Sequence, residues 1–202
     1  MTVRTSLLAA AALFGMSTAA FAVPVSGQLS LGGFAAAVGS VGMGAATGID
    51  FVSNGSGSRS PGVAGGITSF GAGSGSFAGF SCASTGGSCG SIQDISSFAS
   101  QGALSSFLTL TSGSTTVSFD LTKISNVSND LTNNQLGFTA TGFINESGFD
   151  RTAGTFNLTA QGDNIVSFSA TTLAAASVPE PASLALLGGT LTLVGLIRRK
   201  KA

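Results

Sequence analysis

The stretch Thr155-Phe-Asn-Leu-Thr-Ala-Gln-Gly-Asp-Asn-Ile-Val-Ser-Phe-Ser-Ala-Thr-Thr172 decides the fold class of this chain. Apolar side chains occupy every second position on both sides of a polar turn at residues 161–164, which indicates two strands that each bury one face. A short turn between two such strands is typical of a β-hairpin. The residues predicted to face the core are Phe156, Leu158, Ala160, Val166, Phe168 and Ala170.

The same alternation recurs upstream, at residues 117–121 and 136–140. Further apolar segments lie at residues 92–98 and 107–110. Between the two ends of the chain, no stretch of ten residues combines helical periodicity with good helix formers. We therefore predict an all-β body, an antiparallel β-sandwich of jelly-roll type whose core is filled by Phe side chains.

Glycine is concentrated in the first half of this body, where residues 27–90 contain 19 of the 30 glycines. A glycine in a strand costs conformational entropy and offers no side chain to pack. We therefore predict short strands, loops and bulges in this half.

Charged residues are only 8% of the chain, against about 25% in an average soluble domain. Between Val23 and Val178, three basic residues stand against seven acidic ones, which gives a net charge of −4. An acidic surface with so few lysines repels phosphate backbones. Nucleic acid is therefore excluded as a partner.

Residues 1–22 have the three parts of a secretory signal. Arg4 gives a basic start, residues 7–16 form an apolar core, and Ala20 and Ala22 are small enough for the cleavage site. As a helix this core is about 15 Å long, too short to cross a bilayer core of about 30 Å. We predict a signal helix, cleavage after Ala22 by signal peptidase, and export to an oxidising compartment.

The last 25 residues, 178–202, form the second targeting segment. Residues 182–197 carry no charge and would be about 24 Å long as a helix, close to the length of a transmembrane helix. A basic cluster follows, which favours the cytoplasmic side of a membrane and would stop an exported chain there. Its members are Arg198, Arg199, Lys200 and Lys201.

This tail resembles the PEP-CTERM sorting signal, in which a Val-Pro-Glu-Pro start precedes an apolar helix and a basic end. The motif residues here are Val178, Pro179, Glu180 and Pro181. The resemblance implies recognition and cleavage by an exosortase, a membrane-embedded cysteine protease, and co-export with exopolysaccharide. It also implies a transient stay in the inner membrane and a final place on the cell surface or in the extracellular matrix. Such tails are also labelled ice-binding protein C-terminal domains, a label that describes the tail and no activity.

The body is similar to the all-β bodies common in PEP-CTERM proteins, including the segment at residues 148–156. That resemblance implies no activity. The predicted organisation is thus a signal peptide at residues 1–22, a β-sandwich body at 23–177 and a sorting signal at 178–202.

Cys82 and Cys89 are the only cysteines, and both lie in the exported part. An even pair in an oxidising compartment predicts a disulfide. A redox or metal pair is the alternative, but no histidine or third cysteine accompanies it.

The commonest general base and metal ligand are missing because the chain contains no histidine. Paired carboxylates could still act as in glycosidases, and the candidates are Asp120, Asp130, Glu146, Asp150 and Asp163. We expect most of them at strand ends or turns, and Asp150 next to Arg151 as a surface pair or a strand-end bond. Calcium could be held by two polar clusters, which are Asp130, Asn133 and Asn134, or Asp163 and Asn164.

Ice-binding surfaces use regular Thr-x-Thr arrays, but only two such triplets occur, at Thr109-Leu-Thr111 and Thr139-Ala-Thr141, without a fixed period. We expect no catalytic residue, no cofactor and no metal. The predicted function is that of a non-enzymatic surface or biofilm-matrix protein. The alternatives are a carbohydrate- or ice-binding module on an exposed sheet face, and a hydrolase that uses carboxylates.

Overall fold

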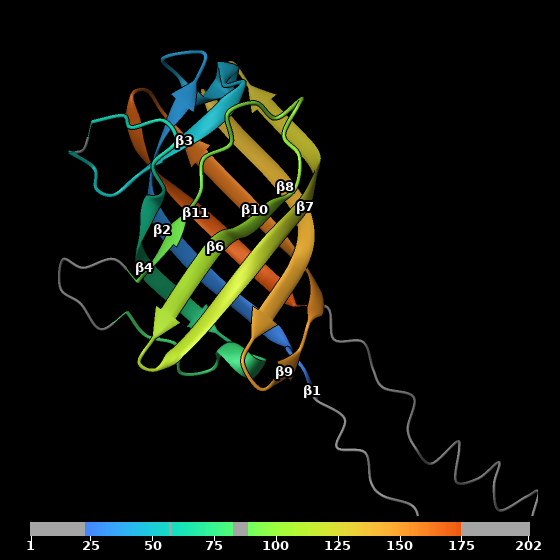
Figure 1. The fold of residues 1–202 in the computed structure, drawn as a ribbon. Helices are drawn as coiled ribbons and strands as arrows, with labels where there is room; N and C mark the ends of the chain where they lie inside the picture. The colour runs from blue at the N-terminus through green and yellow to red at the C-terminus, as the bar shows by residue number, and fades with distance from the viewer. Residues whose placement is uncertain (1–22, 57, 83–88, 175–202) are drawn as a thin grey trace, which may run out of the picture.

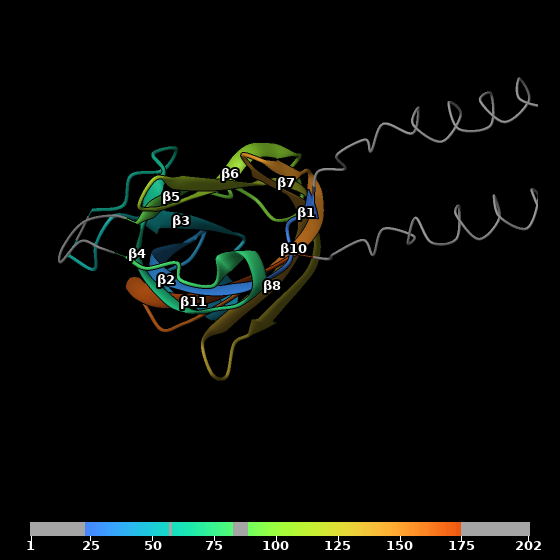
Figure 2. The same cartoon turned by 90° about the horizontal axis from the view of Figure 1, so that it is seen from below.

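The predicted hairpin is one part of a ring of antiparallel strands (Figures 1 and 2). The computed structural model of the chain describes residues 23–56, 58–82 and 89–174. Around the ring, each strand pairs with the next, and the last pairs with the first. The order is β2 (Gly27–Val38), β4 (Gly65–Gly73), β5 (Gly90–Ile92), β6 (Leu104–Ser112), β7 (Thr115–Asp130), β8 (Gln135–Glu146), β10 (Thr152–Gln161) and β11 (Ile165–Ala174).

The all-β prediction is confirmed, but the sandwich is wrong, because the sheet closes into an eight-stranded barrel. Closure depends on β11 and β2, which pair from Ile165 with Ala36 to Ala174 with Gly27. A strand that buries one face has the same alternation in a sandwich and in a barrel. The pattern therefore predicted the strands correctly and could not show which two of them close the ring.

Strand β2 also corrects the prediction of short strands in the glycine-rich half, because it is 12 residues long. It pairs with β11 along one side, and with β4 and then β3 (Gly48–Val52) along the other. Its glycines make room for this crowding, since a β-carbon at Gly33 would lie 2.7 Å from the ring of Phe168. The predicted bulges are present as register shifts between β2 and β4.

Phenylalanine rings fill the inside of the barrel, as predicted. Phe156 lies at its centre, with ring centroids 5.3 Å from Phe107, 6.3 Å from Phe119 and 5.8 Å from Phe138. Met43, in the 3-10 turn η1 (Met43–Ala45), and Phe77, in η2 (Gly75–Phe77), are fully buried. Because η1 bonds to Gly162 and η2 bonds to Ser26, these two turns cover opposite ends of the barrel (Figure 1).

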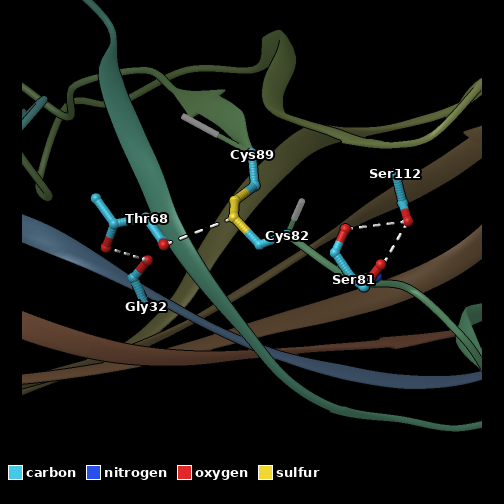
Figure 3. Close-up of a disulfide and its surroundings, with 6 residues drawn as sticks. All are labelled: Gly32, Thr68, Ser81, Cys82, Cys89 and Ser112. Carbon is cyan, nitrogen blue, oxygen red and sulfur yellow. Dashed lines mark hydrogen bonds between the residues drawn. A yellow bond between two sulfur atoms is a disulfide. The ribbon is translucent and has the colours of Figure 1, made fainter. Parts of the chain in front are cut away.

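The structure contains the predicted disulfide between Cys82 and Cys89 (Figure 3). Cys89 directly precedes β5, which is three residues long and pairs with only two residues of β4. Cys89 extends the pairing of β5 with both neighbouring strands, because its amide donates to Ile67 of β4 and its carbonyl accepts from Thr111 of β6. The disulfide thus ties the segment after β4 to the shortest strand of the barrel.

The two ends of the body leave the barrel side by side, because Gly27 and Ala174 are paired. The short strands β1 (Val23–Pro24) and β9 (Phe149–Asp150) form a parallel pair at this same end (Figure 1). Among the described residues, no helix has the length and apolar character needed to cross a membrane. The predicted signal helix and transmembrane helix lie outside the described residues.

Candidate functional site

Asp120 was the first carboxylate considered for catalysis, and the structure gives it a structural role in the middle of β7. The neighbouring strand β6 bulges where Ser106 adopts a φ of 50°. Ser106 then donates its amide to Asp120 Oδ1 at 2.8 Å. Asn145 and Arg151 contact Oδ2, at 2.9 and 3.5 Å. Asp120 therefore compensates the bulge, and it is the exception to the expectation that most of these carboxylates lie at strand ends or turns.

The bond from Ser106, followed by those from Asn145 and Arg151, lowers the pKa of Asp120 below its usual value. A lowered pKa means that the folded state binds this proton less readily than the unfolded state, so the stabilisation is lost as the pH falls. We expect Asp120→Asn to be less stable than the wild type at pH 6. This difference should shrink below about pH 4, the usual pKa of aspartate. Denaturant unfolding of both proteins at pH 6 and below about pH 4 measures the difference in stability. A difference that does not change with pH would contradict the assignment.

Arg151 also corrects an expectation, because it pairs with Asp120 and not with the adjacent Asp150. Its guanidinium lies over the ring of Phe143, 3.9 Å from the centroid. Asp150 and Glu146 lie at strand ends, as expected. Glu146 has one buried oxygen without a partner among the described residues, and burial raises its pKa.

The two clusters considered for calcium lie in neighbouring turns at the η1 end of the barrel. Asp130 accepts from the amides of Thr132 and Asn133 and from the side chain of Asn133. Asp163 accepts from the Asn134 side chain at 2.8 Å. Both carboxylates thus have hydrogen-bond partners within their turns, and neither is buried with an unsatisfied oxygen that would call for a cation. In the part of the chain that the structure describes, no three Asp, Glu, His or Cys residues come together as metal ligands.

Asp50 and Asp94 form an acidic pair that the sequence pattern did not predict. Ile49 and Ile95 exchange two main-chain hydrogen bonds, at 2.8 and 2.9 Å. In an antiparallel arrangement this bridge places the next two residues, Asp50 and Asp94, opposite each other with their side chains on one face. Directly opposed residues have β-carbons about 4.5–5.5 Å apart.

Asp50 is 1% exposed, although its side chain points away from the barrel interior, where Ile49 and Phe51 are buried. Neither of its oxygens has a hydrogen-bond partner among the described residues. The Ser60 amide lies near Asp50 without the geometry of a hydrogen bond. Asp94, in contrast, accepts from the amides of Phe51 and Gly62, both at 2.7 Å.

Burial raises the pKa of Asp50, and the charge of Asp94 raises it further, while Arg59 and the Ser60 amide oppose the rise. Burial also raises the pKa of Asp94, against the two main-chain amides that lower it. A sequence signal for this pair existed, because both aspartates stand inside apolar runs, Gly48-Ile-Asp-Phe-Val52 and Ile92-Gln-Asp-Ile95.

A second feature is the polar outer surface of β8, β10, β11 and β2. Because the core-facing residues alternate with outward-facing ones, the strand register aligns polar side chains in rows across the wall. In the central row Thr139 donates to Asn157 at 2.8 Å. The rows, which we call the polar ladder, are Thr139, Asn157, Thr171 and Ser30, then Thr141 and Thr155, and then Thr159 and Ser169. The second row is interrupted on β11 by the exposed Leu173, which pairs with Gln28 of β2.

The two Thr-x-Thr triplets do not form one array. Thr109 and Thr111 lie on β6 and pair with residues 116 and 118 of β7. Thr139 and Thr141 lie on β8 and pair with residues 123 and 126 of β7. Only the second triplet belongs to the polar ladder.

Comparison with known proteins identifies the tail. Residues 177–201 match the family model of the PEP-CTERM protein-sorting motif. This range includes the predicted Val178–Pro181 motif, the apolar segment and the basic cluster, so the resemblance stated from the sequence is confirmed. Neither the curated proteins nor the solved structures contain a significant match to the chain.

Proposed function

We propose that the chain is an exported protein that an exosortase sorts through residues 177–201 to the cell surface or the biofilm matrix. The observation that carries this proposal is the match of the tail to the PEP-CTERM protein-sorting motif. Signal peptidase would remove residues 1–22, and the tail would stay in the inner membrane until cleavage. Exopolysaccharide is the proposed companion at the final location.

The geometry of the body supports this route. Both ends of the barrel domain, at Gly27 and Ala174, lie at the same end of the barrel. Only three residues separate Ala174 from the Val178–Pro181 motif, a reach of about 10 Å when fully extended. A membrane-held tail would therefore keep this end of the barrel at the membrane and the η1 end away from it.

Replacing Pro179, Glu180 and Pro181 together with alanine tests the sorting step. In a host that contains an exosortase, we expect the variant to remain cell-associated with its tail intact, while the wild type is processed. Intact mass of the protein from each cell fraction reads out both cleavage sites.

The matched control is Pro61→Ala, which changes an exposed proline in the body and should leave processing unchanged. Equal processing of the triple variant and the wild type would contradict exosortase sorting. Full-length protein that is soluble inside the cell would contradict export itself.

We assign the body a non-enzymatic structural role. The described carboxylates considered for catalysis are engaged in a bulge, in turns and at strand ends. Hydrolysis of a polysaccharide by the purified protein, lost when two of these carboxylates are neutralised, would contradict this assignment.

Carbohydrate binding on the polar ladder is the second candidate function. Its central row aligns hydroxyl and amide groups across four strands, and shallow grooves of about 370 Å³ border the polar ladder on either side. Sugar hydroxyls bond well to such uncharged groups. Ice binding fits this surface less well, because a barrel wall is curved.

A glycan array with the purified protein tests the second candidate. We expect Asn157→Ala to weaken the binding of a retained glycan at least about tenfold, the cost of about 1.4 kcal/mol of hydrogen bonding. Thr109→Ala, on β6 outside the polar ladder, is the control and should bind as the wild type does. No binding by the wild type would remove this candidate.

A further inference from the structure

The wall of the barrel contains two opposed carboxylates that lack a counter-ion, Asp50 and Asp94. Like charges placed directly opposite each other on neighbouring strands destabilise a sheet. Asp50 is also buried with two oxygens that no described residue satisfies. A buried carboxylate without a partner is costly, so the arrangement needs either a proton or a cation.

The nearest basic side chain does not neutralise the pair. Arg59 is exposed, and within the described ranges Arg151 with Asp120 is the one ion pair found. Arg59 therefore acts on Asp50 only from a distance. The two carboxylates therefore need a proton or a cation from solution to neutralise them.

We propose that Asp50 and Asp94 form a calcium-binding site in the wall of the barrel, beneath the segment at residues 58–64. Calcium takes six to eight oxygen ligands and uses carboxylates and main-chain oxygens freely. The two aspartates supply the carboxylates, and water completes the set. The chain contains no histidine, and its two cysteines are joined in a disulfide, so softer metals find no ligands here.

The Asp94 side of the pair can be reached from the surface. Asp94 and Gly62 border a surface groove of about 480 Å³. Asp94 holds the segment at residues 58–64 through the Gly62 amide, at 2.7 Å. An ion bound by both aspartates would thus join β3, the segment that follows β5 and this loop. Exported proteins meet calcium at concentrations that suit sites with dissociation constants of about 10⁻⁴ to 10⁻³ M.

Thermal unfolding of the full chain in detergent tests the site, with EDTA in one sample and about 10 mM CaCl2 in the other. For a dissociation constant near 10⁻⁴ M, we expect calcium to raise Tm by about 5 °C or more. Asp50→Asn should abolish this rise. It should unfold in EDTA at or above the wild-type temperature, because it removes the repulsion with little change in volume.

Asp130→Asn is the matched control, because it neutralises a half-buried aspartate at the end of β7, away from the pair, and should keep the full rise in Tm. Equilibrium dialysis should find one calcium ion per wild-type chain and none for Asp94→Asn, whether or not Asp50→Asn folds. An unchanged wild-type Tm would show that a shared proton occupies the pair and would overturn the proposal. A rise that persists in Asp50→Asn would overturn it too, and an equal rise with Mg²⁺ would overturn the assignment to calcium. These results do not depend on sorting, so they can fail independently of the proposed function.

Discussion

Replacing Phe156 with alanine is expected to lower the free energy of unfolding by about 4 kcal/mol. Phe156 is fully buried at the centre of the barrel, and its ring contacts those of Phe107, Phe119 and Phe138. Alanine removes the buried ring and leaves a cavity, because strands bonded on both sides cannot move in to fill it. Denaturant unfolding with a measured slope gives the change directly.

The control for this prediction is Phe149→Ala in β9. Phe149 is 36% exposed, so its loss should cost less than about 1 kcal/mol. Equal effects of the two substitutions would mean that the barrel interior is not the core of the protein. If the wild type is stable by only about 5 kcal/mol, the lower limit for a small domain, a loss of about 4 kcal/mol leaves Phe156→Ala only marginally folded.

Replacing Gly142 with alanine is expected to cost about 3 kcal/mol, although it adds only one methyl group. A β-carbon at this position would collide with the main-chain oxygen of Asp120 and lie 2.8 Å from the ring of Phe119. Relief of the collision requires β7 to move away from β8, which strains the hydrogen bonds between them. The change therefore outweighs the gain of up to about 1 kcal/mol that alanine usually brings by restricting the unfolded chain.

Gly137→Ala provides the control on the same strand. The nearest atoms to its β-carbon would be Leu158 O at 3.7 Å and Thr159 Cγ2 at 3.9 Å, which is ordinary contact. We expect unchanged stability or a gain of up to about 1 kcal/mol. If Gly142→Ala behaved in the same way, the close approach of β7 and β8 would be disproved.

The candidate sites differ in how much of each could be predicted from the sequence. The sorting motif is contiguous, so its residues could be identified directly, and the family match agrees. The pair Asp50 and Asp94 was missed, because it depends on one bridge between Ile49 and Ile95. Arg151 was assigned to its neighbour Asp150 and pairs instead with Asp120 on another strand, for the same reason. Sequence neighbours are visible in the chain, whereas partners across strands depend on the register.

The sequence by itself determined the strands in the second half of the body and the faces that they bury. Side chains alternate between the two faces of a strand, so a short segment such as Phe156 to Ala160 already contains the signal. The disulfide and the sorting tail could also be predicted from short stretches of the sequence.

Only the tertiary structure decided that the sheet is a barrel. Closure requires β11 to pair with β2, and these two strands come from opposite ends of the body. The alternation of side chains in either strand does not indicate which strand it pairs with. The glycine-rich β2 can take that place because Gly33 lets the Phe168 ring approach its backbone. Pairing between distant segments depends on how all the strands fit together in space, and this is why local periodicity predicts the strands but not their closure.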